Sequence, residues 1–124
     1  RGDLAGNYLE TSGSAMAAYT VLKGCRVGIL ERDKYFGTGE RILAALASEK
    51  IKARDGKFYL TGICASGGLG LKDGIPGQAV RDGSPEYYLG EDVKDDNAHG
   101  VAACMMAYSE WLKAAGRKEE EIVA

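Results

Sequence analysis

The sequence predicts a mainly α-helical fold with one short β-hairpin and one long ordered loop. In three separate segments, apolar residues recur at three- and four-residue steps, as they do on one face of a helix. An Asp-Gly pair stands between two short apolar segments, which is the strongest local hairpin signal in the chain. A glycine-rich stretch of 31 residues, from 61 to 91, shows neither helical nor strand periodicity.

Size and composition narrow the classes of protein. The chain has 124 residues and a net charge of -2, so we expect a single domain over residues 1–124. Its 16 basic against 18 acidic residues give no support for nucleic-acid binding. No apolar run reaches the ~18 residues that a membrane span needs, and no signal peptide is recognisable. Because the first residue is Arg1, we expect that upstream sequence has been lost.

The cysteines indicate a reducing compartment. Cys25, Cys64 and Cys104 are odd in number and widely spaced, which argues against a disulfide framework and favours a cytoplasmic location. No Cys-x-x-Cys or His-x-x-x-His spacing suggests a metal site. Cys25 and Cys104 lie in apolar helical stretches, where we expect buried structural thiols.

The first predicted helix covers residues 14–30. Gly24 and Gly28 lie four apart inside it, and close approach of another helix would compensate for their low helix propensity. The residues that follow three- and four-residue steps are Met16, Tyr19, Lys23, Arg26, Val27 and Leu30, while alanines between them supply high helix propensity.

The stretch NYLETSGSAM precedes this helix and contains more capping residues than a helix needs. Thr11, Ser12, Gly13 and Ser14 all compete for the cap, and we expect Thr11 or Ser12 to fill it. Glu10 stands beside them. The stretch is therefore either an over-supplied cap or a helix end that presents polar groups to a ligand.

The second predicted helix covers residues 39–50. Its apolar stripe consists of Ile42, Leu43, Leu46 and Ala47, and charged residues lie on the opposite, solvent-facing side. Asp55 and Gly56 then predict the hairpin turn. Because a lone hairpin is marginally stable in water, we expect this one to lie against the helices.

The third predicted helix covers residues 98–115. Asp96 or Asn97 can cap it, and Gly116 suits the position after its end. The residues that align on one face of this helix are Val101, Met105, Tyr108, Leu112 and Ala115. The first and third helices both have broad apolar faces, which need more neighbours than three helices supply.

Few residues have a pattern that indicates chemistry. The GGLG stretch lacks the phosphate-binding spacing that would indicate nucleotide binding. His99, in the first turn of the third helix, is either a donor or base at a site, or a residue bonded to the preceding loop. Glu10 and Glu86 have aromatic or small neighbours, whereas most other acids, Glu91 among them, are expected to be solvated loop charges. Four aromatic residues could form stacking platforms for sugar rings: Tyr8, Tyr87, Tyr88 and Trp111. For Trp111, packing in the core is the preferred interpretation.

Three separated motifs resemble one family. NYLETSGSAMAAYTVLKGCRVGIL, GGLG and GSPEYYLGEDVKDDNAHGVAACMMAYSE are similar, in this order, to the C-terminal part of the unsaturated rhamnogalacturonyl hydrolases. These enzymes form glycoside hydrolase family 105 and are related to the unsaturated glucuronyl hydrolases of family 88. The resemblance covers residues 3–110.

This resemblance implies a fold and an activity. The fold would be a fragment of an (α/α)6 six-hairpin barrel, and the substrate an unsaturated uronyl oligosaccharide from pectin. In the family an Asp protonates the vinyl ether, water adds, and the hemiketal opens to release rhamnose or a rhamnosyl chain. No metal or organic cofactor is implied, and the expected location is cytoplasmic.

The resemblance also implies what this chain lacks. Family members are considerably longer, and their catalytic Asp lies in the N-terminal half, so no catalytic residue is assigned here. The isolated chain is expected to be inactive. The residues expected to contribute to the wall of the sugar pocket are Glu10, Thr11, Ser12, Ser14, Tyr87 and His99.

Two other interpretations stay open. The chain could be a non-catalytic module that binds sugar, or a homo-oligomer that closes a helical shell through exposed helix faces. It could also be another (α/α) barrel enzyme whose end is similar by coincidence.

Overall fold

A computed structural model describes residues 3–71, 76 and 80–116 of the chain. Three long helices dominate it, α1 (Thr11–Arg26), α2 (Arg32–Ala45) and α4 (Ala98–Ala114), and a π-helical turn, η1 (Leu46–Lys50), extends α2. A hairpin of β1 (Ile51–Arg54) and β2 (Lys57–Leu60) follows this turn. The segment between the hairpin and α4 contains β3 (Ile63–Cys64), β4 (Gly70–Leu71), β5 (Val80–Arg81), α3 (Pro85–Leu89) and β6 (Val93–Lys94). The predicted mainly α fold is confirmed.

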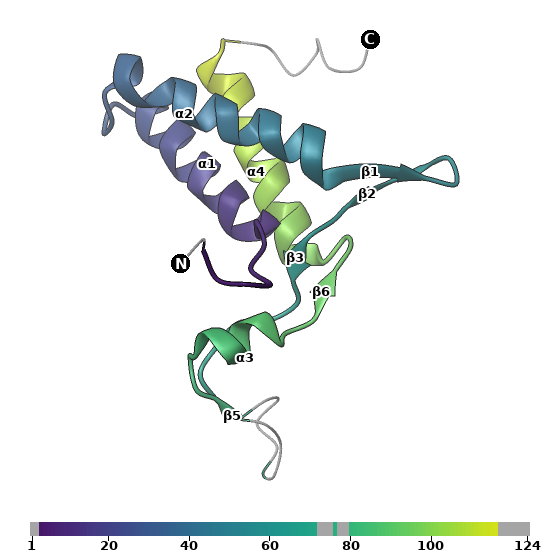
Figure 1. Cartoon of the computed structure of the whole chain (residues 1–124). Coiled ribbons are helices and arrows are strands. Elements are labelled where there is room, and N and C mark those ends of the chain that lie inside the picture. The colour runs from purple at the N-terminus through teal and green to yellow at the C-terminus, as the bar shows by residue number, and fades with distance from the viewer. Residues whose placement is uncertain (1–2, 72–75, 77–79, 117–124) are drawn as a thin grey trace.

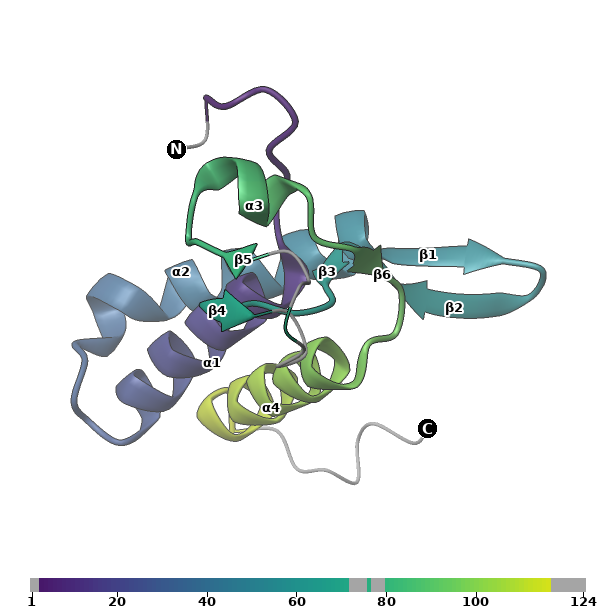
Figure 2. The same ribbon diagram turned by 90° about the horizontal axis from the view of Figure 1, so that it is seen from below.

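The helix α1 is the centre of the molecule. It packs against α2 on one side and against α4 on another, whereas α2 and α4 make little contact with each other. Both ribbon views show the three helices side by side, with the hairpin extending away from them (Figures 1 and 2). In the described part of the chain, no helix is both long and apolar enough to cross a bilayer.

Small residues, rather than the large apolar ones, form the contact between α1 and α4. Ala15 and Ala18 of α1 and Ala107 of α4 are completely buried. Of the residues that the three- and four-residue steps align, Met16 and Tyr108 are about half exposed, whereas Leu112 is buried. Each helix carries an apolar stripe and an alanine stripe, and periodicity does not show which one faces the neighbour. Alanines allow the two backbones to approach closely, and they displace the large side chains to other faces.

The bounds of α1 differ from the prediction at both ends. The helix begins three residues earlier, at Thr11, and ends at Arg26 because Gly28 adopts a positive φ of 78°. The chain then folds back, and the N–H groups of Ile29 and Leu30 donate to the Gly24 carbonyl. A Cβ on Gly24 would lie 2.8 Å from Leu30 Cδ1. Gly24 therefore makes room for the returning loop. The close approach of a second helix, which we expected at this glycine, does not occur there.

The helix α2 begins seven residues before the predicted start at Gly39. In its first turn the Arg32 guanidinium stacks 3.9 Å from the centre of the Phe36 ring, an i,i+4 pair that supports the helix. Gly39 is buried, and a Cβ there would lie 2.6 Å from Leu22 Cγ. This glycine thus serves close packing between α1 and α2, and it does not mark a helix boundary.

The predicted hairpin is confirmed, although its position is not as expected. Asp55 and Gly56 both have positive φ, as a two-residue hairpin turn requires. The strands pair in antiparallel register, with Ile51 opposite Leu60 and Ala53 opposite Phe58. Phe58 is 77% exposed, and only the base of the hairpin approaches the helices. The expectation that the hairpin lies against the helices is therefore wrong for most of its length.

The glycine-rich loop is ordered wherever the structure describes it. Strand β3 pairs with β6 and β4 pairs with β5, while Ser84 Oγ caps α3 by accepting from the Tyr87 N–H. Residues 72–75 and 77–79 of this loop lie outside the described residues. The segment lies at the end of the molecule where α1 and α4 begin (Figure 1).

The helix α4 begins as predicted. Asn97 is its capping residue, although its side chain makes no cap hydrogen bond. Asp96 instead accepts from the Leu60 N–H at 2.8 Å, which ties the helix start to the base of the hairpin. A Cβ on Gly100 would lie 2.6–2.8 Å from Ile63 side-chain atoms, so this glycine lets β3 approach α4.

Candidate functional site

Polar side chains gather where α1 begins, against the segment of residues 64–91. They include two acids that are 81 positions apart in sequence: Glu10, which is half-buried, and Glu91, which is buried. We call this cluster the polar end, and its members are Tyr8, Glu10, Ser12, Cys64, Ser66, Arg81, Tyr87, Tyr88 and Glu91.

Glu10 is the cap of α1, so the prediction of Thr11 or Ser12 is wrong. Its carboxylate accepts from the backbone N–H groups of Ser12 at 3.0 Å and Gly13 at 2.6 Å. The same carboxylate accepts from the N–H of Cys64 at 3.0 Å, which joins the helix start to β3. Burial acts to raise the pKa of Glu10, but hydrogen bonds from Gly13, Cys64 and Ser12 together hold this pKa below its ordinary value. Glu10 is therefore held as a carboxylate.

The three hydroxyls predicted to line a sugar pocket all donate to groups within the chain. Thr11 Oγ1 donates to the Thr61 carbonyl at 2.6 Å, and Ser14 Oγ donates to the Glu10 carbonyl at 2.7 Å. Ser12 Oγ lies 2.8 and 2.9 Å from the two carboxylate oxygens of Glu10. Thr11 and Ser12 are buried, so the structure explains the surplus of hydroxyls by internal hydrogen bonding.

Arg81 and Glu91 form a buried ion pair in the loop segment. Arg81 Nε lies 3.2 Å from Glu91 Oε1, and the two side chains are only 13% and 5% exposed. Arg81 also donates to Ser66 Oγ at 2.9 Å. The expectation that Glu91 is a solvated loop charge is therefore wrong.

The aromatic residues of the polar end pack on one another. The Tyr8 and Tyr88 rings stack with their centroids 5.9 Å apart, so neither ring is a free platform on that side. The hydroxyls of Tyr8 and Tyr87 are buried and have no hydrogen-bond partner among the described residues. Burial, followed by the neighbouring side chains of Tyr88 and Cys64, raises the pKa of Tyr8. Burial, followed by the neighbouring carboxylate of Glu91, raises the pKa of Tyr87. Both tyrosines stay neutral hydroxyls at physiological pH.

His99 is the one predicted site residue that the structure does not join to the others. It is exposed in the first turn of α4, and among the described residues no hydrogen bond or ion pair connects it to the polar end. Glu10, Thr11, Ser12 and Ser14 lie together at the α1 start, and Tyr87 belongs to the same cluster through its neighbour Glu91.

Sequence reasoning missed Cys64, Ser66 and Arg81. Pairing of β3 with β6, and of β4 with β5, brings their segments together, and strands of two residues leave no periodicity to detect. The glycine-rich composition signalled an ordered loop, but it did not indicate which polar residues meet. Within the described ranges, no group of three or more His, Cys, Asp or Glu residues could hold a metal ion.

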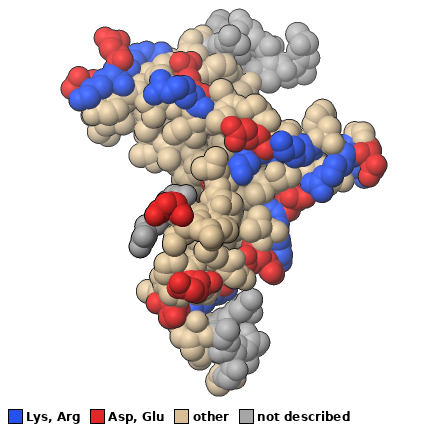
Figure 3. Space-filling model, viewed as in Figure 1, with Lys and Arg blue, Asp and Glu red and all other residues tan. Residues whose placement is uncertain are grey.

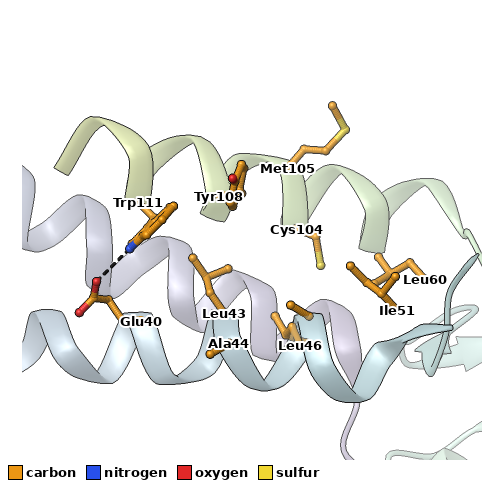
Figure 4. A pocket seen from close by; sticks show the side chains of 11 residues that line it. Glu40, Leu43, Ala44, Leu46, Ile51, Leu60, Cys104, Met105, Tyr108 and Trp111 are labelled. Carbon is orange, nitrogen blue, oxygen red and sulfur yellow. Dashed lines mark hydrogen bonds between the residues drawn. The ribbon is translucent and has the colours of Figure 1, made fainter. Parts of the chain in front are cut away.

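A separate hollow lies between α2 and α4 and has a volume of about 570 Å³ (Figure 4). Its lining is almost entirely apolar, and its one acid, Glu40, accepts from Trp111 Nε1 at 3.0 Å. A sugar needs several convergent hydrogen-bonding groups, so this hollow does not suit one. On the face in Figure 3, basic and acidic side chains are interspersed and form no field of one sign.

The sequence is similar to several known proteins. Residues 1–115 match the family Glycosyl Hydrolase Family 88. A protein of Agrobacterium fabrum and a 24.9 kDa protein in the picA locus of Rhizobium radiobacter are each 46% identical over 113 residues. Each match covers 88% of this chain but 47% of the relative. The chain thus spans about half the length of the curated relatives it matches.

The fold is similar to that of a solved enzyme. The structure superposes on the family 105 glycoside hydrolase of C. acetobutylicum with a TM-score of 0.78 and 36% identity. The match covers 91% of this chain and 30% of that enzyme. Three helices, the hairpin and the loop segment therefore correspond to a fragment of a helical barrel.

Proposed function

The chain belongs to glycosyl hydrolase family 88, and from this membership we propose that the polypeptide containing it is an unsaturated rhamnogalacturonyl hydrolase. Its substrate would be a pectin-derived oligosaccharide with a 4,5-unsaturated galacturonic acid at its non-reducing end. These 124 residues would form one domain within a six-hairpin barrel and would lack the general acid. The observation that carries the proposal is the family match over residues 1–115, together with the likeness to a family 105 enzyme.

The polar end supports a role in shaping the sugar site and not in proton transfer. A general acid at neutral pH needs a pKa raised toward 7, whereas the pKa of Glu10 is lowered. The carboxylate of Glu10 is also occupied by hydrogen bonds from Ser12, Gly13 and Cys64. Glu10 would then fix the wall of the pocket, and an Asp outside this chain would protonate the vinyl ether.

The remaining predicted residues would have different parts in that wall. Tyr87 carries a neutral hydroxyl, which suits hydrogen bonding to a sugar. Ser12 and Ser14 would contribute through their position at the α1 start. His99 is exposed and separate from the cluster, so its contact with a sugar would need another part of the protein.

A comparison of two polypeptides tests this proposal. We expect the longest polypeptide that contains this chain in its reading frame to consume the 4,5 double bond of an unsaturated rhamnogalacturonan disaccharide, measured as a loss of its ultraviolet absorbance and a gain of free rhamnose. We expect the 124-residue chain alone to release none. Turnover by the 124-residue chain that is lost in Glu10→Gln would contradict the assignment of the acid to another segment.

A non-catalytic role in self-assembly is the second candidate. Large apolar side chains on α4 are exposed, with Met105 68% and Met106 49% accessible, and such surfaces favour association. Sedimentation of the 124-residue chain separates the two candidates. A stable oligomer that binds uronyl sugar, in a reading frame with no further barrel segment, would favour the module over the enzyme fragment.

A further inference from the structure

We propose that the turn at the tip of the hairpin is a site of spontaneous covalent modification, at which Asp55 converts to isoaspartate whenever the hairpin tip opens. The sequence contains three Asp-Gly pairs, Asp55-Gly56, Asp73-Gly74 and Asp82-Gly83. The pair at 73–74 lies outside the described residues, and the structure distinguishes the other two. The proposal concerns the chemistry of the chain itself, so it stands whether or not the protein is a hydrolase.

The reaction uses only groups of the turn and water. The backbone nitrogen of Gly56 attacks Cγ of Asp55, and its proton leaves together with the carboxyl OH as water, which gives a cyclic succinimide. Water then adds to one of the ring carbonyls. Breaking the bond between Cγ and the Gly56 nitrogen restores aspartate, whereas breaking the bond at the backbone carbonyl gives isoaspartate. The product is an isomer of the original chain, so no oxidant or other reactant is needed.

The pair Asp55-Gly56 is accessible to this attack. Both residues are exposed, and a Cβ on Gly56 would meet no atom within 4 Å. Among the described residues, no hydrogen bond or ion pair holds the Asp55 carboxylate, and none engages the Gly56 N–H. Because glycine has no side chain, its nitrogen is also unshielded. The reacting groups therefore have no partners to lose.

The position of the hairpin makes opening of its tip easy. The hairpin extends away from the three helices, and only its base approaches them (Figures 1 and 2). All four residues of β1 are exposed. Ring closure requires rotation of the Asp55 backbone, which the closed two-residue turn fixes. Since a two-stranded hairpin is marginally stable in water, this local opening should cost little free energy.

The pair Asp82-Gly83 is also exposed, but its neighbours restrain it. Asp82 Oδ1 accepts from the Ser84 N–H at 2.8 Å, and a Cβ on Gly83 would lie 3.0 Å from Leu69 Cδ2. Hydrogen bonds from the Ser84 hydroxyl and N–H lower the pKa of Asp82. A smaller fraction of its carboxyl is then protonated and able to lose OH as water. The two pairs thus share their sequence and exposure and differ in restraint.

Isomerisation at residue 55 would affect more than the turn. In isoaspartate the backbone runs through Cβ and Cγ and gains an atom, so a two-residue turn no longer fits the register of Arg54 and Lys57. Arg54 also forms an ion pair with Asp95, just before α4 begins. We expect the modification to loosen this link between the hairpin and the start of α4.

Ageing of the folded chain at neutral pH tests the proposal. We expect isoaspartate, measured by peptide mapping and by methylation with an isoaspartyl methyltransferase, to accumulate at residue 55 at least about tenfold faster than at residue 82. In guanidinium chloride the restraint on Asp82 is lost, so the two rates should agree within about twofold. Ageing in water enriched in ¹⁸O should place solvent oxygen in the isoaspartate, because the succinimide is opened by water.

Two substitutions of the same kind provide a matched test. Asp95→Asn removes the ion pair with Arg54 and should raise the rate at residue 55 by about two- to fivefold, because the hairpin opens more often. Asp33→Asn, at an exposed position of α2, should leave this rate unchanged. Three results would each overturn the proposal: no isoaspartate at residue 55, equal rates at residues 55 and 82 in the folded chain, or equal rates at residue 55 in the two variants.

Discussion

The polar end and the hollow between α2 and α4, which we call the apolar groove, differ in how far their side chains find partners among the described residues. At the polar end, Glu10 and the hydroxyl of Ser12 find partners within the chain, and Arg81 is buried against Glu91. In the groove, Met105 and Tyr108 remain exposed beside a buried base. The polar network is thus satisfied by groups of this chain, whereas part of the apolar groove is open to solvent.

The physical reason lies in what each kind of group tolerates. An unpaired buried charge costs several kcal/mol, of order 3–5 when a pair is broken, so polar partners must be present for the local structure to persist. Exposed apolar surface costs only about 25 cal/mol per Å², so a folded chain tolerates some of it in contact with water. Substitutions at the polar end should therefore affect the isolated chain strongly, while those in the groove should affect it little.

The largest effect is expected at the buried ion pair. Glu91→Ala leaves Arg81 buried without this partner, and we expect the free energy of unfolding to fall by about 3–5 kcal/mol. Urea titration followed by circular dichroism measures this change. The paired variant Arg81→Met with Glu91→Leu should recover most of the loss, because it removes both charges. A loss below about 1 kcal/mol for Glu91→Ala would show that the pair is solvated and would weaken the comparison.

An intermediate effect is expected at the helix cap. Glu10→Gln replaces an acceptor oxygen by an amide nitrogen beside the donors of Ser12, Gly13 and Cys64, and should lower stability by about 2 kcal/mol at pH 7. The pKa of Glu10 is lowered in the folded state, so its contribution is present above the ordinary value of 4.5 and is lost as the pH falls through the folded-state pKa. Unfolding measured between pH 7 and pH 3 should show the gap between wild type and variant narrowing below about pH 4.5. A gap that widens in acid would contradict this assignment.

The smallest effect is expected at the rim of the groove. Glu40→Ala removes the acceptor for Trp111 Nε1, but the bond is exposed, so stability of the 124-residue chain should change by about 0.5 kcal/mol or less. Tryptophan fluorescence should nevertheless shift, since Trp111 is the only tryptophan in the sequence. A loss of stability as large as that of Glu10→Gln would contradict this expectation and show that the rim of the groove is rigid in this chain.

The sequence by itself determined the helices and the turn of this protein. Periodicity placed α4 correctly at its start, and Asp55 and Gly56 predicted the hairpin, because both signals act over a few residues. The ordered motifs also indicated the family and the fragment of a helical barrel, which the matches to known proteins confirm. No local signal was strong enough to choose between the alanine stripe and the large apolar stripe of α1 and α4.

Only the tertiary structure decided what the helices face and which polar groups meet. Gly39 and Gly100 each make room for a side chain from a distant segment, Leu22 and Ile63, respectively. Glu10 caps its own helix but also binds the N–H of Cys64, which lies 54 residues away. Such contacts depend on the position of the whole chain in space. The hydrogen bond from Thr11 Oγ1 to the Thr61 carbonyl also depends on this packing, whereas the hydroxyls of Ser12 and Ser14 bond locally to Glu10.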